Sequence, residues 1–195
     1  MLLDKLDGHK IILASQSPRR KELLNLMNIP FAVRLKPVEE IFPDDLNGKE
    51  IAEHIARLKA NAHLEDIAVD EIIITADTVV WCDGRAMGKP ADVAGAKEMI
   101  KHLSGKTHEV ITAICLLTST GIITDSDVVT VHFKDLTDEE IDFYIEDYKP
   151  FDKAGAYGIQ EWIGHVGITK IEGAYNTVVG LPTHLLYAML NRLLN

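Results

Sequence analysis

Cysteine is scarce in this sequence, and long apolar runs are missing. Cys82 and Cys115 are the only cysteines among 195 residues, and both lie in apolar stretches. A chain of this length needs no disulfide, and neither cysteine has a Cys or His partner at metal-ligand spacing, so we expect two buried thiols. No apolar run reaches the length of a transmembrane helix, and residues 1–10 lack the apolar core of a signal peptide. The sequence therefore predicts a cytoplasmic protein without a membrane partner.

Positive charge is also in short supply. The chain has 20 Lys and Arg against 30 Asp and Glu, which gives a formal net charge of −10. A general nucleic-acid-binding protein normally carries a basic field over one face, so this balance argues against that class. An acidic protein can still bind a polyanion where its cations gather at one site. The positions of Arg and Lys are therefore more informative than their number.

The chain shows no internal repeat, low-complexity segment or linker, and we predict a single domain over residues 1–195. Short apolar runs predict strands over residues 10–14, 31–35, 71–76 with an extension over 79–82, 110–117, 122–133 and 167–171. Capping signals and helical spacing predict helices after Ser17-Pro18, over 50–63, after Asp92, after Thr137 and from Pro182. This order predicts an α/β fold, a mixed twisted sheet flanked by helices, with two lobes and a central cleft.

The first candidate site is the segment 15–20 (SQSPRR), between a predicted strand and a predicted helix. Strand-to-helix turns are favoured ligand sites in α/β folds, and the free amides of a helix N-terminus attract phosphate. The two serines add hydroxyl donors, and Arg19 and Arg20 add forked donors that suit phosphate oxygens. On its own, this segment is better explained as an ordinary capped helix with solvated arginines, since short stretches of Ser, Pro and Arg are common.

Asp77 is the second candidate. It follows the apolar run 71–76 (EIIITA), where a carboxylate is costly unless it is paired or functional. A capping or turn aspartate is the alternative, but Val79 and Val80 continue the chain as strand residues. We therefore favour a functional carboxylate.

Two glycine-containing segments complete the set. Residues 88–90 (GKP) follow the Asp83-Gly84 turn, and Lys89 offers a point charge for phosphate. Residues 152–160 (DKAGAYGIQ) are too rich in small residues to serve packing alone. They end at Gln160, whose amide has both a donor and an acceptor and could read the edge of a base.

Together these motifs resemble the Maf family of nucleotide pyrophosphatases, whose architecture is shared with the inosine triphosphate pyrophosphatases. The resemblance covers nearly the whole chain, and the looser stretch is 162–165. The motifs occur in the family's order: LASQSPRRKELL (13–24), VEE (38–40), ADTVV (76–80), GKP (88–90), LSGKTHEVITA (103–113), DKAGAYGIQ (152–160) and GLP (180–182). The wording of 152–160 is similar to the branch that acts on dTTP and UTP rather than the branch that acts on 7-methyl-GTP.

The resemblance implies roles for individual residues. Asp77 becomes the proton acceptor, and Glu39 shares a divalent metal, Mg²⁺ or Mn²⁺, with Asp77. The remaining residues bind the nucleotide: Arg19, Thr78 and Gln160 set base preference, and Arg20, Lys59 and Lys89 hold the triphosphate, with Ser15 nearby. Without the family, Lys59 reads as a solvated lysine on an amphipathic helix. Sequence alone does not separate Glu39 from Glu40.

The implied reaction is hydrolysis of dTTP or UTP to the monophosphate and pyrophosphate, by metal-assisted attack of water at the α-phosphorus. The choice of the α-phosphorus comes from the family. The alternative is a nucleotide-binding regulator of septum formation without significant turnover, and Asp77 argues against it, because a pure binder has no reason to place a carboxylate beside a triphosphate. The long strands within 110–133 could supply the edge of a homodimer.

Overall fold

The computed structural model describes residues 1–195 and contains one seven-stranded mixed sheet. Its strand order is β2-β1-β3-β5-β6-β7, and β4 pairs with β3 outside this path. β1 lies parallel to β2 and β3, and all other pairs are antiparallel. The strands are β1 (Lys10–Leu13), β2 (Phe31–Val33), β3 (Glu71–Cys82), β4 (Arg85–Met87), β5 (Thr107–Thr118), β6 (Gly121–Phe133) and β7 (Ile168–Glu172). The predicted mixed sheet is confirmed.

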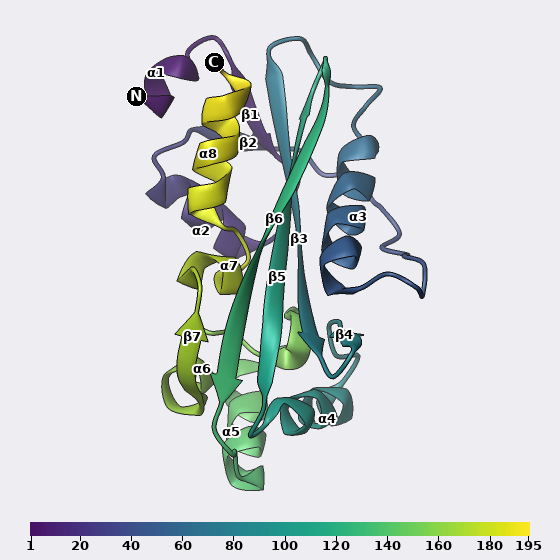
Figure 1. Ribbon diagram of the computed structural model, residues 1–195, viewed down its shortest axis with the longest axis vertical. Helices are drawn as coiled ribbons and strands as arrows, with labels where there is room; N and C mark the ends of the chain where they lie inside the picture. The colour runs from purple at the N-terminus through teal and green to yellow at the C-terminus, as the bar shows by residue number, and fades with distance from the viewer.

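The helices cover both faces of the sheet and one of its ends (Figure 1). They are α1 (Leu2–Lys5), α2 (Pro18–Leu26), α3 (Gly48–Asn61), α4 (Val93–Leu103), α5 (Asp138–Tyr148), α6 (Trp162–Gly167), α7 (Tyr175–Val179) and α8 (Thr183–Leu193), with a 3₁₀ turn η1 at Ala154–Ala156. Three predicted caps are confirmed, because the side chains of Ser17, Asp92 and Thr137 each accept a hydrogen bond from the first turn of the following helix. None of the helices combines the length and apolar character needed to cross a bilayer.

The buried side chains form three clusters around β3 and its neighbours. One cluster packs α1, α2 and α8 against one face of the upper part of the sheet, and a second packs α3 against the opposite face (Figure 1). The third joins α4, α5 and α6 at the lower end. Two lobes therefore share the long strands of one sheet. Cys82 and Cys115 are free and buried within these clusters, as predicted.

Strand β3 has a gap in its pairing. β5 covers one edge of β3 from Ile73 to Trp81. On the other edge of β3, pairing with β1 stops at Ile74 and pairing with β4 starts at Val80. Residues 75–79 of β3 therefore have no neighbouring strand on that edge. The gap lies where the two lobes meet. It leaves room for a ligand beside a strand that is otherwise buried in the sheet.

Candidate active site

A cleft of about 910 Å³ opens at the gap in β3 and is lined from both lobes. The structure brings together nearly all of the residues selected from the sequence. Those that line the cleft are Ser15, Arg19, Arg20, Lys59, Asp77, Thr78, Lys89 and Gln160. Glu39 is exposed and does not line the cleft, whereas its neighbour Glu40 does.

Asp77 and Thr78 point to opposite faces of the sheet, because successive residues of a strand alternate. Asp77 shares the α3 face with Ile73 and Val79, which pack in the α3 cluster. Thr78 shares the other face with Val80. The cleft thus has a carboxylate on one face of β3 and a hydroxyl on the other, and different helices supply the cations that reach them.

Lys59 of α3 is the cation on the Asp77 face. Its Nζ lies 2.8 Å from Asp77 Oδ1 and 2.9 Å from Glu40 Oε1. The side chains of Lys59 and Asp77 are only 19% and 14% exposed, so this ion pair is largely shielded from water. The solvated lysine that helical spacing alone suggested is therefore wrong, because α3 turns Lys59 toward the gap in β3.

Burial and charge act in opposite directions on the two carboxylates. Burial raises the pKa of Asp77 above its ordinary value, although the charge and hydrogen bond of Lys59 oppose this effect. Burial also acts to raise the pKa of Glu40, but the hydrogen bond and charge of Lys59, followed by the charges of Lys89 and Arg20, outweigh it and lower the pKa. Burial thus favours the protonated form of Asp77, whereas the neighbouring cations favour the ionised form of Glu40.

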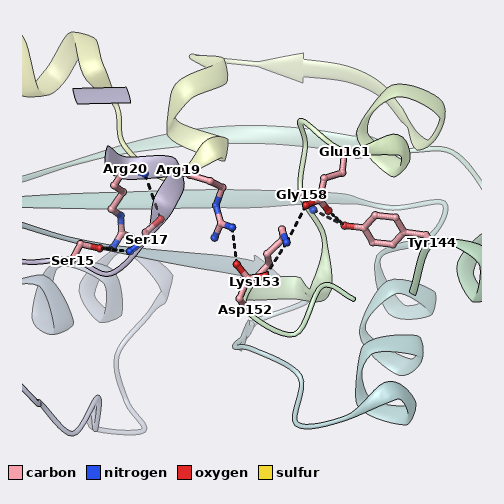
Figure 2. A network of polar contacts seen from close by, with 9 residues as sticks. All are labelled: Ser15, Ser17, Arg19, Arg20, Tyr144, Asp152, Lys153, Gly158 and Glu161. Carbon is pink, nitrogen blue, oxygen red and sulfur yellow. Dashed lines mark hydrogen bonds and ion pairs between the residues drawn. The ribbon is translucent and has the colours of Figure 1, made fainter. Parts of the chain in front are cut away.

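Arg20 of α2 is the cation on the Thr78 face, and it is held at three points. Figure 2 shows the one with Ser15. Arg20 Nε donates to Gly180 O at 2.9 Å, Nη1 to Ser15 Oγ at 3.2 Å and Nη2 to Thr78 Oγ1 at 3.2 Å. Thr78 also exchanges a hydrogen bond with Thr112 Oγ1 at 3.0 Å. This bracing fixes the guanidinium before any anion arrives.

The lower lobe contributes Lys89 and Gln160, and Arg19 reaches toward it from α2. Arg19 Nη1 lies 2.8 Å from Asp152 Oδ2, at the start of the glycine-rich segment 152–160 (Figure 2). Lys89 and Gln160 are both exposed on the cleft wall, and no hydrogen bond joins either side chain to the protein. They are free to bind a ligand.

The donor set of the cleft suits a hard divalent cation. Mg²⁺ is usually held by one or two carboxylates together with substrate phosphates, and it needs no cage of protein ligands. Asp77 and Glu40 are two such carboxylates, and both already contact one ammonium, that of Lys59. The two carboxylates therefore already face a common positive charge, and their oxygens are of the kind that Mg²⁺ prefers. The metal-ligand role of Glu39 stays a prediction, and the Glu39 side chain does not line the cleft.

Sequence reasoning missed the residues that brace the glycine-rich segment. Lys153 is almost fully buried and forms an ion pair with Glu161. Glu161 in turn accepts a hydrogen bond from the Tyr144 hydroxyl of α5 (Figure 2). A basic residue in a glycine-rich segment reads as solvated, and Tyr144 is one of several apolar positions on its helix. Only the tertiary fold joins them.

A second group of potential metal ligands lies apart from the cleft. Ligand atoms of Cys82, Asp83 and His102 all lie within 4.8 Å of one another. The spacing of these residues did not suggest a site, since α4 brings His102 back to the end of β3. Asp83 Oδ2 lies 2.6 Å from Lys106 Nζ, and none of the three residues lines the cleft.

Comparisons with known proteins identify the family and the fold class. A family model described as "Maf-like protein" matches residues 10–193. The dTTP/UTP pyrophosphatase of Flavobacterium johnsoniae is 51% identical over 193 residues, covering 99% of this chain and 100% of that protein, and that of Phocaeicola vulgatus is 52% identical, covering 98% and 100%. The Ham1 protein of Staphylococcus aureus matches in structure with a TM-score of 0.54 at 17% identity, covering 94% of this chain and 98% of that one, which confirms the predicted fold class. The chain belongs to the Maf family.

Proposed function

We propose that this protein hydrolyses dTTP and UTP to the nucleoside monophosphate and pyrophosphate. Full-length relatives at about 50% identity carry that name. The observation that carries the proposal is Asp77, a shielded carboxylate with a raised pKa that faces a cleft lined by cations. A site that only bound a triphosphate would gain nothing from this negative charge.

Three cations receive the triphosphate. Phosphoryl transfer depends chiefly on positioning and on neutralisation of charge. Arg20 offers a fixed guanidinium, because Ser15, Thr78 and Gly180 already hold it. Lys59 and Lys89 supply further charge from α3 and from the turn after β4. The phosphates lie along the gap in β3, between the two lobes.

A divalent metal, Mg²⁺ or Mn²⁺, completes the charge balance. Asp77 and Glu40 would hold it, and Glu40 replaces Glu39 in this role because only Glu40 lines the cleft. When bound, the metal polarises the phosphate and stabilises the charge on the departing pyrophosphate. Lys59 then keeps the two carboxylates close to the phosphates.

Asp77 takes the proton of the attacking water. Burial raises its pKa and so makes it a better base than an exposed aspartate, while the charge and hydrogen bond of Lys59 favour its ionised form. The water oxygen bonds to the α-phosphorus, the bond from the α-phosphorus to the bridging oxygen breaks, and pyrophosphate leaves. The family's chemistry is the reason for choosing the α-phosphorus.

Gln160 reads the base. Thymine and uracil share an imide edge, an N–H donor between two carbonyl acceptors, and one side-chain amide matches it with two hydrogen bonds. Cytosine presents a different pattern at the same positions, and leaving the partners unpaired costs ~1–3 kcal/mol. Arg19 lies on the same side of the cleft, paired with Asp152, and Thr78 contributes by holding Arg20.

A release assay across a panel of nucleotides tests the proposal. It should separate pyrophosphate from orthophosphate in the presence of Mg²⁺ or Mn²⁺. We expect pyrophosphate release, with dTTP and UTP turned over faster than CTP, ATP and GTP. Orthophosphate as the first product would contradict attack at the α-phosphorus. Tight binding of dTTP without any turnover would favour a regulatory role.

A further inference from the structure

Gln160 lies in a tight turn that is closed by a backbone hydrogen bond. Glu161 N–H donates to Gly158 O at 3.0 Å, so Gly158, Ile159, Gln160 and Glu161 form a four-residue turn with Gln160 as its third residue. Ile159 is buried, whereas Gln160 is exposed on the cleft wall. The direction of the Gln160 amide therefore depends on how firmly the two ends of this turn are held.

One buried hydroxyl holds both ends. Tyr144 Oη accepts a hydrogen bond from Gly158 N–H at 3.0 Å and donates one to the Glu161 carboxylate (Figure 2). Tyr144 belongs to α5, and its side chain is fully buried in the lower core cluster. The brace thus comes from a rigid helix rather than from the loop itself.

The brace continues across the segment to Arg19. The second Glu161 oxygen lies 3.0 Å from Lys153 Nζ, which is 2.8 Å from Asp152 Oδ1, and Asp152 Oδ2 pairs with Arg19. The Lys153–Glu161 pair is shielded from water and costly to break, whereas Asp152 is 56% exposed and its ion pairs contribute less. This chain of contacts runs from α5 to α2 and has Gln160 near one end and Arg19 at the other.

The turn is packed as closely as its hydrogen bonds imply. A Cβ atom added at Gly158 would lie 2.9 Å from Glu161 Cδ and 3.1 Å from Lys153 Cε. No larger residue fits there without moving the carboxylate or the lysine. Glycine at 158 therefore lets the backbone lie directly on the braced groups.

We propose that Tyr144 is a positioning residue for base selection: its hydroxyl fixes the turn 158–161 so that Gln160 presents its amide at one place and in one direction. The proposal rests on the function proposed for Gln160 above. A two-point match to an imide edge tolerates little displacement, so a loosened turn loses base discrimination before it loses affinity for phosphate. The other interpretation is that Tyr144 only stabilises the lower lobe.

Tyr144→Phe separates the two interpretations, because it removes the hydroxyl and keeps the ring. Tyr148→Phe is the matched control on the same helix, since the ring of exposed Tyr148 stacks on Tyr144 at 5.2 Å and its hydroxyl touches no part of the turn. Ile141→Val, also buried on α5, controls for lost stability alone. Dissociation constants for UMP and for pyrophosphate report the base half and the phosphate half of the cleft separately.

For Tyr144→Phe we expect the UMP dissociation constant to rise about tenfold while that of pyrophosphate changes less than twofold. The dTTP-to-CTP ratio of kcat/KM should narrow by a similar factor. Both controls should keep the wild-type ratio. Unchanged UMP affinity in Tyr144→Phe would overturn the proposal, as would a parallel loss of UMP and pyrophosphate affinity.

Gln160→Glu, measured alongside, distinguishes a failure of this inference from a failure of the function on which it rests. If Gln160→Glu narrows the dTTP-to-CTP ratio and Tyr144→Phe does not, the brace is wrong and base reading by Gln160 stands. If Gln160→Glu leaves the ratio unchanged, base reading fails and the brace fails with it. Should Tyr144→Phe not fold, Glu161→Ala removes the carboxylate to which the Tyr144 hydroxyl donates, at a residue outside the cleft lining, and carries the same expectations.

Discussion

Two irregular segments line the cleft, residues 35–46 and 152–161, and they are held in opposite ways. In the first, the only backbone hydrogen bond is donated by Leu46 N–H to Pro43 O, and two ion pairs, Lys36–Asp66 and Glu40–Lys59, tie the segment to the rest. The second is bonded to Gly88 O and to Tyr144 and contains a run of buried residues from 155 to 159. One segment is open and the other is fully braced.

The difference follows from what each segment presents to the nucleotide. Glu40 of the first segment would contact a metal, and an open segment can adjust to bring its carboxylate to the short ligand distance that Mg²⁺ requires. Gln160 of the second acts by hydrogen bonds, which weaken steeply when distance or angle is wrong. A carboxylate for a metal can thus lie on an open segment, whereas a side chain that reads a base needs a rigid one.

The largest expected loss of turnover comes from a change at Asp77 of β3, which lies outside both segments but lines the same cleft. Asp77→Asn keeps the shape and removes the base, so turnover should fall by about two powers of ten or more. The melting temperature should change little, because the variant removes a carboxylate whose charge burial already opposes. Pyrophosphate release under saturating dTTP measures the effect. Near-normal turnover would exclude Asp77 from the mechanism.

The braced segment should loosen in acid through His108. Burial lowers the pKa of His108 from its ordinary value near 6.5 to about 4, and its Nε2 lies 2.8 Å from the Tyr157 hydroxyl within the segment. The unfolded chain binds this proton first as pH falls, so stability is lost between about pH 6.5 and pH 4, by at most about 3 kcal/mol. Urea unfolding at pH 7.5 and pH 4.5 measures this loss.

His108→Gln should reduce the difference in unfolding free energy between those two pH values. His9→Gln, at an exposed position, should leave it as in the wild type. A His108→Gln protein with the full wild-type pH dependence would place the acid sensitivity elsewhere, for example in the carboxylates whose pKa values are lowered by ion pairs.

The open segment is tested by its two adjacent carboxylates. Glu40→Gln should raise the Mg²⁺ concentration for half-maximal activity by about tenfold, because it removes one of two candidate ligands. Glu39→Gln should change it less than twofold, since Glu39 lies outside the cleft. Metal titrations at fixed dTTP compare them directly. The reverse order would restore Glu39 as the ligand and would require the segment to shift when nucleotide binds.

The sequence predicted the elements that have strong local signals. Ser17, Asp92 and Thr137 mark their helices by capping chemistry, and the long strands follow from apolar runs. The helices that it missed, α1, α6 and α7, have six residues or fewer, too short for a periodic pattern. The gap in β3 was also invisible, because it depends on where β1 and β4 end.

Much the same division holds for the site. Asp77 could be selected because a carboxylate is out of place after an apolar strand. Lys59 could not be selected from its helix, since its partners, Asp77 and Glu40, come from distant segments. Tyr144 and Lys153 were missed because their contacts with Glu161 exist only in the folded chain. Local chemistry finds the reacting group, and tertiary packing decides what supports it.

The smallest expected effect is at Lys89, an exposed cation that acts by charge but lies next to the braced segment, where Gly88 O accepts a hydrogen bond from Gly155 N–H at 3.1 Å. A pair of charges about 4 Å apart in water is worth ~1 kcal/mol, so Lys89→Ala should raise the KM for dTTP about fivefold at low salt. Because salt screens exposed charges, the difference should shrink toward twofold or less near 0.5 M salt, roughly where the Debye length falls below 5 Å. Lys49→Ala, at a lysine outside the cleft, should leave KM unchanged at both salt concentrations. A change that persists undiminished in high salt would mean that Lys89 supports the Gly88–Gly155 contact rather than the triphosphate. Lys89 would then act through the fold of the braced segment and not through its charge.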